Sequence, residues 1–231
     1  MYLWQMQIRT ILKPFALISS YVFHPIFLLF CALFLLLCLK PHLFGVIVWS
    51  EKTVLLLITF IYTVFIPAVG IGLMRWTGLI KSFHMTDRFD RFIPLIICAI
   101  FNLWLWINLK SQDDIPKLFV AFVLSAIVCI FFSFVINTKL KLSLHAASWS
   151  AFCTLWWKVR FNFSDDQIHY LRFCKENVSS FHMNGLLIIS IIIAAWVGSC
   201  RLYLNAHSTD ELFMGYLIGI ISTIIAFSYT F

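Results

Sequence analysis

Long runs of apolar residues recur along this chain, separated by short polar connections. A run of about 17 to 25 apolar residues can cross the hydrocarbon core of a bilayer as one helix. The pattern predicts helices over seven segments, which are 15–39, 53–74, 93–109, 116–137, 145–160, 185–200 and 211–230. A shorter apolar patch over 43–49 is expected to lie along the interface or to enter the membrane as a re-entrant piece.

The balance of polar and apolar residues excludes a soluble domain. Hydrophobic residues make up 62% of the 231 positions and charged residues 12%, which leaves too little polar material to cover a water-exposed surface. The first apolar run is too long for a signal-peptide core and has no small-residue cleavage site, so we expect it to be retained as a span. We predict an all-α, polytopic membrane bundle of about six to seven helices, with residues 1–231 forming a single domain.

Three polar connections, over residues 75–94, 137–145 and 201–211, carry lysines, arginines, a serine and histidines. Two predicted spans separate the first connection from the second, and two more separate the second from the third. The chain therefore returns to the same face of the membrane each time, and the three connections are expected to share one site. Together these residue types can bind a phosphate through charge-assisted hydrogen bonds and attack it.

The third connection contains the most informative spacing, an arginine and a histidine six positions apart between two hydrophobic runs. Arg201 can hold an anion, and His207 can act as a nucleophile or carry a proton near neutral pH. An ionisable pair placed between two membrane spans is a candidate functional site. The pair predicts phosphate chemistry at a membrane surface.

These residues resemble the signature of the type 2 phosphatidic acid phosphatases, a superfamily of membrane lipid phosphatases. That signature has three parts: a lysine six residues before Arg-Pro, then Pro-Ser-Gly-His, and then Ser-Arg followed after five residues by a histidine and after three more by an aspartate. Cys200-Arg201 and His207 match the third part, and Glu211 stands at the aspartate position.

The second part resembles Ser143-Leu-His145, which keeps the serine and the histidine but has lost the proline and glycine. The stretch 212–219, with its two glycines, also resembles the helix that follows in the family. The resemblance covers roughly residues 75–231 and weakens toward the N-terminus, so that residues 1–74 are read as additional N-terminal spans.

Two choices remain open for the lysine of the first part. Lys81 and Arg88 have the family spacing, although Phe89 replaces the proline. Lys139 or Lys141 could supply the lysine instead, because the first two parts of the signature usually share one loop in the family.

The resemblance implies a mechanism that needs no metal or other cofactor. His207 would attack phosphorus and form a phosphohistidine, while Glu211 would hold the other ring nitrogen. His145 would protonate the leaving lipid alcohol and later activate water. The residues that would bind the phosphoryl oxygens are Arg201, Ser143, Lys81, Arg88 and Lys141.

Several of these residues also have structural interpretations. Ser208 and Glu211 fit a capping box at the start of the last helix, and Asp210 could orient His207 in place of Glu211. The changed residues around Ser143 and His145 favour an alternative function, in which a lipid-binding or transport protein of the same fold holds phosphate without turnover.

Some polar positions are expected to be structural. Single cations at span ends, including Arg75, Lys139, Lys141 and Arg91, are typical interfacial anchors, as is the Trp156-Trp157-Lys158 end of the fifth segment. His24, next to Pro25, is expected to be a packed polar residue, and His84 and His182 belong to no motif. The connection 161–184 is expected to be a solvated loop, with an interfacial helix or a partner contact as alternatives, and the Asn177-Val178-Ser179 glycosylation triplet decides nothing alone.

The partners and the location follow from charge. Of the 17 lysines and arginines, nine fall on the motif face and eight on the other, which fixes no orientation. Setting aside Lys81, Arg88 and Arg201 as site residues leaves six against eight, which favours the motif face outside the cytoplasm, as in a bacterial inner membrane. The net charge of +7 favours anionic lipids. We expect a lipid phosphate substrate within the bilayer and no nucleic-acid partner.

Overall fold

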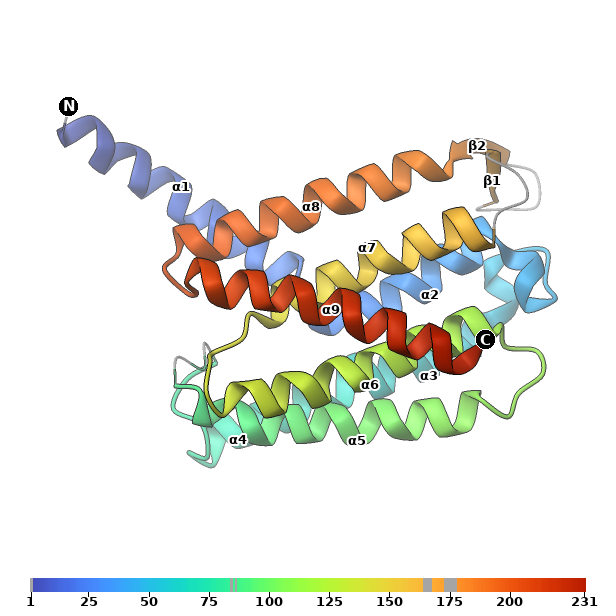
Figure 1. Cartoon of the computed structure of the whole chain (residues 1–231), viewed down its shortest axis with the longest axis horizontal. Coiled ribbons are helices and arrows are strands. Elements are labelled where there is room, and N and C mark those ends of the chain that lie inside the picture. The colour runs from blue at the N-terminus through green and yellow to red at the C-terminus, as the bar shows by residue number, and fades with distance from the viewer. Residues whose placement is uncertain (1, 84, 86, 164–167, 173–177) are drawn as a thin grey trace.

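The computed structural model describes residues 2–83, 85, 87–163, 168–172 and 178–231. Nine α-helices account for most of these described residues, and their long members run alongside one another (Figure 1). The helices are α1 Tyr2–Val22, α2 Leu28–Leu39, α3 Thr53–Phe60, α4 Ile66–Trp76, α5 Phe92–Leu109, α6 Lys117–Asn137, α7 Leu144–Asn162, α8 Met183–Tyr203 and α9 Thr209–Thr230.

Six helical stretches of the described chain are long and apolar enough to cross a membrane. They are Leu12–Leu39, Pro41–Trp76, Phe89–Leu109, Lys117–Asn137, Met183–Tyr203 and Thr209–Thr230. The predicted polytopic helical bundle is therefore confirmed, and the chain is an integral membrane protein. A seventh helix, α7, runs through the bundle beside these stretches and corresponds to the short predicted segment 145–160.

Helix α7 is more polar than its neighbours because other helices surround it. It packs against both α8 and α9. Hydrogen bonds to carbonyl oxygens of the preceding turn are donated by the hydroxyls of Ser148, Ser150 and Thr154. Such internal bonds satisfy polar groups that lipid could not. Of the two tryptophans predicted as an interfacial anchor at its end, Trp156 is fully buried and Trp157 is half exposed.

Two predicted helices are interrupted. The first, predicted over 15–39, breaks between α1 and α2 at His24, whose ψ of 137° is extended, and the short 3-10 turn Pro25–Phe27 follows. A residue before proline disfavours the helical conformation, and proline offers no N–H to the preceding turn. The second, predicted over 53–74, contains a π-helical turn at Ile61–Phe65, just before Pro67.

The end of the bundle opposite the three motif connections is held by structural contacts. The patch 43–49 begins in the 3-10 turn Pro41–Phe44 and ends in the 3-10 turn Trp49–Lys52. Its Phe44 is 1% exposed and packs in the core, whereas its Ile47 is 57% exposed. At the same end Lys52 pairs with Asp114, and the buried Lys40 donates to the carbonyl of Phe163.

The connection between α7 and α8 contains a two-stranded antiparallel hairpin. Strand β1 Ile168–Arg172 pairs with β2 Val178–His182, with Ile168 opposite His182. The described part of this connection is thus a hairpin rather than the loop or interfacial helix expected from the sequence. Residues 164–167 and 173–177, including Asn177 of the glycosylation triplet, lie outside the described residues, as do 1, 84 and 86.

Glycines in α9 let it approach α7 closely. A methyl group added at Gly219 would lie 1.9 Å from the carbonyl oxygen of Ala147, and one at Gly215 would lie 2.7 Å from the carbonyl oxygen of Ser143. Small residues at such positions allow helix backbones to pack directly in membranes. This contact fixes the start of α9 against the start of α7, where the candidate site lies.

Candidate functional site

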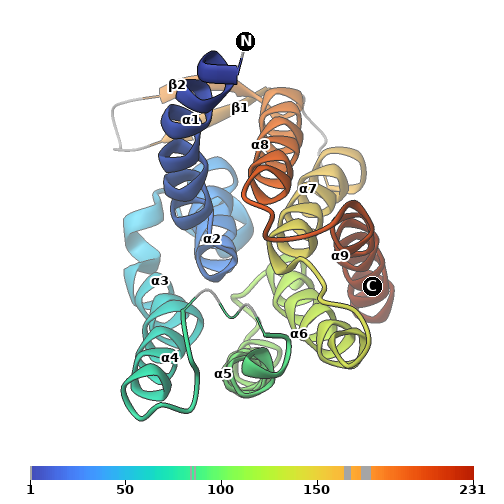
Figure 2. The same cartoon turned by 90° about the vertical axis from the view of Figure 1, so that its left-hand side faces the viewer.

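Three connections that are far apart in sequence meet at one end of the bundle, on the left of Figure 1 and facing the viewer in Figure 2. Asn137 donates to the carbonyl of Arg88 at 2.7 Å, which joins the second connection to the first. Lys141 donates from Nζ to the carbonyl of Ala206 at 3.3 Å, which joins the second to the third. The predicted convergence of the three connections on one face is confirmed.

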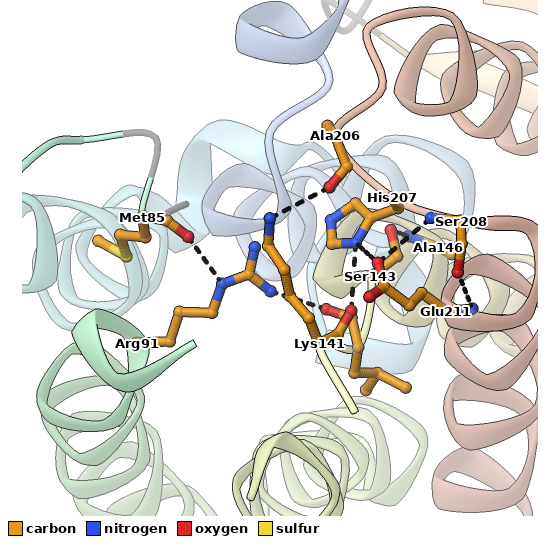
Figure 3. Close-up of polar contacts among 10 residues, drawn as sticks. Met85, Arg91, Lys141, Ser143, Ala146, Ala206, His207, Ser208 and Glu211 are labelled. Carbon is orange, nitrogen blue, oxygen red and sulfur yellow. Dashed lines mark hydrogen bonds and ion pairs between the residues drawn. The ribbon is translucent and has the colours of Figure 1, made fainter. Parts of the chain in front are cut away.

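His207 lies at the centre of this end, with a side chain that is only 2% exposed. Its Nδ1 is 2.9 Å from Oε2 of Glu211 and 3.2 Å from the carbonyl oxygen of Lys141 (Figure 3). Both partners are acceptors, so we assign the ring proton to Nδ1. The lone pair then lies on Nε2, the nitrogen that a nucleophilic histidine uses when a carboxylate holds the other.

Glu211 has two structural functions at once. Its Oε2 also accepts from the backbone N–H of Ser208 at 3.2 Å, and Oγ of Ser208 accepts from the backbone N–H of Glu211 at 3.3 Å. The capping box and the contact with His207 therefore exist together. Asp210 is exposed on the same first turn of α9, so the geometry favours Glu211 over Asp210 as the orienting carboxylate.

Burial keeps His207 neutral. The pKa of His207 is lowered to about 4, chiefly because burial penalises the charged ring and further because Arg91 and Arg201 repel a second proton. The hydrogen bond to Glu211 acts in the opposite direction but does not cancel these effects. At neutral pH the imidazole therefore keeps the unprotonated nitrogen that nucleophilic attack requires.

Among the described residues, the charges of Arg91 and Arg201 act on His207, and Lys141 contacts it through its carbonyl oxygen. Arg91 is 6% exposed and donates from Nη1 to the carbonyl of Leu142 at 2.9 Å and from Nε to that of Met85 at 3.2 Å. Burial, followed by repulsion from Arg91, lowers the pKa of Lys141, and Glu211 opposes that change.

Arg201, in the last turn of α8, is the third cation, and it is partly buried. Its Nε is shielded from solvent and has no acceptor among the described residues. Among the described residues, these three cations form no ion pair, and the nearby carboxylate of Glu211 is bonded to His207. A buried guanidinium nitrogen without a partner is costly, so this arrangement suits a polyvalent anion that would supply the missing acceptors.

Two predicted phosphate ligands lie outside this cluster. Arg88 donates from Nη1 to the carbonyl of Lys139 at 3.1 Å and lies 5.1 Å from the ring of Phe89, while Lys81 is exposed. Arg91 extends into the cluster instead, because the 3-10 turn Phe89–Arg91 rotates it inward. The sequence predicted an interfacial anchor at Arg91, so this contact is a correction. The available signal was its spacing of three residues from Arg88, about one helical turn.

Ser143 and His145 stand at the start of α7. Ser143 is fully buried and caps the helix by accepting from the N–H of Ala146 at 3.4 Å, and its own N–H donates to the carbonyl of Glu211 at 3.2 Å. His145 places Nε2 3.0 Å from the carbonyl oxygen of Ser20 in α1. The carbonyl is an acceptor, so Nε2 carries the proton and Nδ1 keeps the lone pair.

His24 joins the site although it lies at the break between α1 and α2. Its ring is 5.3 Å from that of His145, in an edge-to-face arrangement with an 85° interplanar angle. Nδ1 of His24 accepts from the N–H of Ile26 at 3.3 Å, so its proton lies on Nε2. The sequence predicted a packed polar residue at this position, and the ring does pack, against His145. The proline that follows His24 was the signal of a helix break able to place it here.

The fold and the site define a helical membrane protein with a cluster of cations around a buried histidine at one end of the bundle. Comparison with known proteins finds no matching family model, no matching curated protein and no matching solved structure.

Proposed function

We propose that this chain is a membrane phosphatase that hydrolyses a lipid phosphate or diphosphate through a phosphohistidine on His207. The observation that carries the proposal is the environment of that ring, with Nδ1 held by Glu211 and the Lys141 carbonyl. Its Nε2 is left as the free nitrogen beside Arg91 and Arg201, whose charges act on it. The resemblance to the type 2 phosphatidic acid phosphatases at Arg201, His207 and Glu211 supports the same function.

In the first step the lone pair on Nε2 of His207 attacks phosphorus, and the bond from phosphorus to the lipid oxygen breaks. Arg201, Arg91 and Lys141 stabilise the charge that develops on the phosphoryl oxygens. The leaving oxygen takes a proton and departs as the lipid alcohol. In the second step water attacks the phosphohistidine, which releases inorganic phosphate and restores the neutral ring.

His145 can carry the proton in both steps, as the family resemblance implies. Its Nε2 proton is held by the carbonyl of Ser20 and its Nδ1 has a lone pair, so a second proton on Nδ1 makes the ring an acid. That proton passes to the leaving alcohol, and the neutral ring then takes a proton from the attacking water.

The charge of the cluster also matches the substrate. Three cations and one carboxylate leave a net charge of about +2 when the histidines are neutral, and a phosphate monoester carries a charge between about −1.5 and −2 near pH 7. Binding of such a headgroup would therefore neutralise the charge of this cluster. A zwitterionic or neutral lipid headgroup would leave it uncompensated.

The test is phosphate release by the purified full-length protein in detergent, measured against isoprenoid diphosphates, phosphatidic acid and glycolipid phosphates. We expect His207→Ala and Arg201→Ala each to reduce release by at least about a hundredfold. His42→Ala and Arg75→Ala change exposed residues outside the cluster and serve as matched controls. Release that persists in the His207 variant would remove the proposed nucleophile.

A specific observation keeps the alternative function in the test. The Nε2 of His145 is already engaged by Ser20, which suits a protein that binds phosphate without turning it over. Calorimetric binding of a lipid phosphate, dependent on Arg201 and without release from any variant, would identify a lipid-binding or transport protein.

We also propose that the site end of the bundle faces outside the cytoplasm of a bacterial inner membrane. The support is the excess of lysine and arginine on the opposite end once the site cations are set aside. A cysteine placed at the exposed Lys81 should react with a membrane-impermeant maleimide in intact cells, and one placed at Lys110 should not. The reverse labelling would invert the topology.

A further inference from the structure

An apolar groove begins beside the candidate site and runs into the membrane-spanning part of the bundle. It has a volume of about 300 Å³ and lies where the break between α1 and α2 faces α7 and α8. Its lining contains the imidazole of His24 and is otherwise almost wholly apolar. Typical members are Leu28, Cys31, Leu35, Phe152 and Ile193.

The break at His24 explains why the groove exists. Helix α1 packs on α8, while α2 turns away to pack on α3, α6 and α7 (Figures 1 and 2). One straight helix over residues 15–39 could not follow both courses. The indole N–H of Trp149 donates to the carbonyl of Phe23 at 3.0 Å and fixes the break against α7.

The groove is continuous with the candidate site through one side chain. His24 lines the groove and also packs edge-to-face on His145 at 5.3 Å. Along α8, the groove residue Ile193 precedes Arg201 by eight residues, a rise of about 12 Å. A molecule with its charged end at the cations could therefore extend past His24 into the groove.

The cation cluster and the apolar groove together indicate what kind of molecule could bind. The cations require an anionic headgroup, and the apolar lining, at membrane depth, excludes water and polar groups. A volume of 300 Å³ equals roughly ten water-sized volumes, which accommodates a segment of one hydrocarbon chain rather than two.

We infer that the groove between α2, α7 and α8 holds the single hydrocarbon chain of a lipid phosphate whose headgroup is bound by Arg91, Lys141 and Arg201. The inference rests on the proposed function for the headgroup end only. Lipid tails are as apolar as the groove, so the transfer from bilayer to groove contributes little affinity. The groove instead positions the phosphorus in front of His207, and its filling should alter turnover more than binding.

The first test fills the groove and compares two substrates. In Ile193→Trp, the kcat/KM for hexadecyl phosphate should fall by about tenfold, whereas that for the short, soluble butyl phosphate should stay unchanged. Ile192→Trp is the matched control, because Ile192 is 61% exposed and does not line the groove. If the ratio of kcat/KM for hexadecyl phosphate to kcat/KM for butyl phosphate were the same in Ile193→Trp and Ile192→Trp, the groove assignment would be overturned. The phosphatase function would remain intact.

The second test does not depend on turnover. A hexadecyl phosphonate with a diazirine at mid-chain cannot be hydrolysed, and its crosslinks to the full-length protein can be mapped by peptide mass spectrometry. We expect crosslinks on the groove faces of α2 and α8, reduced by excess unlabelled phosphonate but not by hexadecanol, and lost in Ile193→Trp. Crosslinks spread over all lipid-facing helices, or insensitive to competition, would overturn the inference. Groove crosslinks without hydrolysis of any substrate would reject the phosphatase function alone.

Discussion

His207 shows how much of a reactive side chain is set by its surroundings rather than by its type. The ring has two acceptors on one nitrogen and two arginine charges near it, so both its tautomer and its protonation state are fixed. The sequence predicted His207, Glu211 and Arg201 because their spacing within one connection is visible in the chain. Arg91 and His24 were assigned to other functions, because each reaches the cluster through a local break in helix geometry that the sequence marks only weakly.

The orienting carboxylate can be tested at the residue scale. Glu211→Gln keeps the shape of the capping box but replaces the charged acceptor at Nδ1 of His207 with an amide. We expect kcat to fall by about a hundredfold or more, while Asp210→Asn, one residue earlier and exposed, should lower it less than twofold. The opposite ranking would assign the orienting function to Asp210.

A second residue-scale prediction concerns pH. His207 titrates near pH 4 in the folded protein and near 6.5 when unfolded, so the unfolded state binds more protons between these values. The contribution of the neutral His207 ring to the free energy of unfolding should therefore be fully present above about pH 6.5. It should be lost as the pH falls toward 4, which lowers the free energy of unfolding by up to about 3 kcal/mol. Thermal unfolding in detergent should show this decline, and His207→Asn should weaken it. An unchanged slope in the variant would contradict a buried neutral ring.

At the scale of the element, the site depends on how closely two helices approach. Residues 211–230 were predicted as a helix from hydropathy alone, and the structure adds that α9 lies against α7 through Gly215 and Gly219. For the first predicted helix, by contrast, hydropathy did not predict the observed structure. Its apolar pattern is continuous across residues 15–39, so hydropathy gave no sign of the break, and only His24-Pro25 marked it.

Gly219→Ala should be strongly destabilising, because the new methyl group would lie 1.9 Å from the Ala147 carbonyl oxygen and force α9 away from α7. We expect a loss of about 3 kcal/mol or more together with lost turnover, since Glu211 and His207 move with α9. Gly72→Ala in α4 is the matched control, because a methyl group there meets nothing within 4 Å. Equal melting temperatures of the two variants in detergent would contradict the close packing.

For the whole molecule, the two ends of the bundle use charge differently. At the end opposite the site, Lys40 and Lys52 are engaged by a carbonyl oxygen and a carboxylate. At the site end, Arg91, Lys141 and Arg201 form no ion pair with a carboxylate among the described residues, and Glu211 pairs with His207. Composition and run length predicted the membrane bundle, and parity predicted which connections share a face. The alignment of individual side chains depends on tertiary packing, which no run length encodes.

The ion pair at the far end gives a prediction at this scale. Lys52 lowers the pKa of Asp114, mainly through a side-chain hydrogen bond, but the Asp114 side chain is 59% exposed. Exposed pairs contribute less than about 1 kcal/mol, so Asp114→Asn should barely change the melting temperature and should leave phosphate release unchanged. A large loss of activity would mean that the two ends are coupled through the bundle.

The three connections are joined largely through main-chain oxygens, those of Arg88, Lys139, Leu142 and Ala206. Every amino acid offers the same oxygen, whatever its side chain. Many residues of these loops can therefore be substituted during evolution while the backbone around His207 keeps its shape. Selection need preserve only the side chains that donate to these oxygens, which are those of Arg88, Arg91, Asn137 and Lys141.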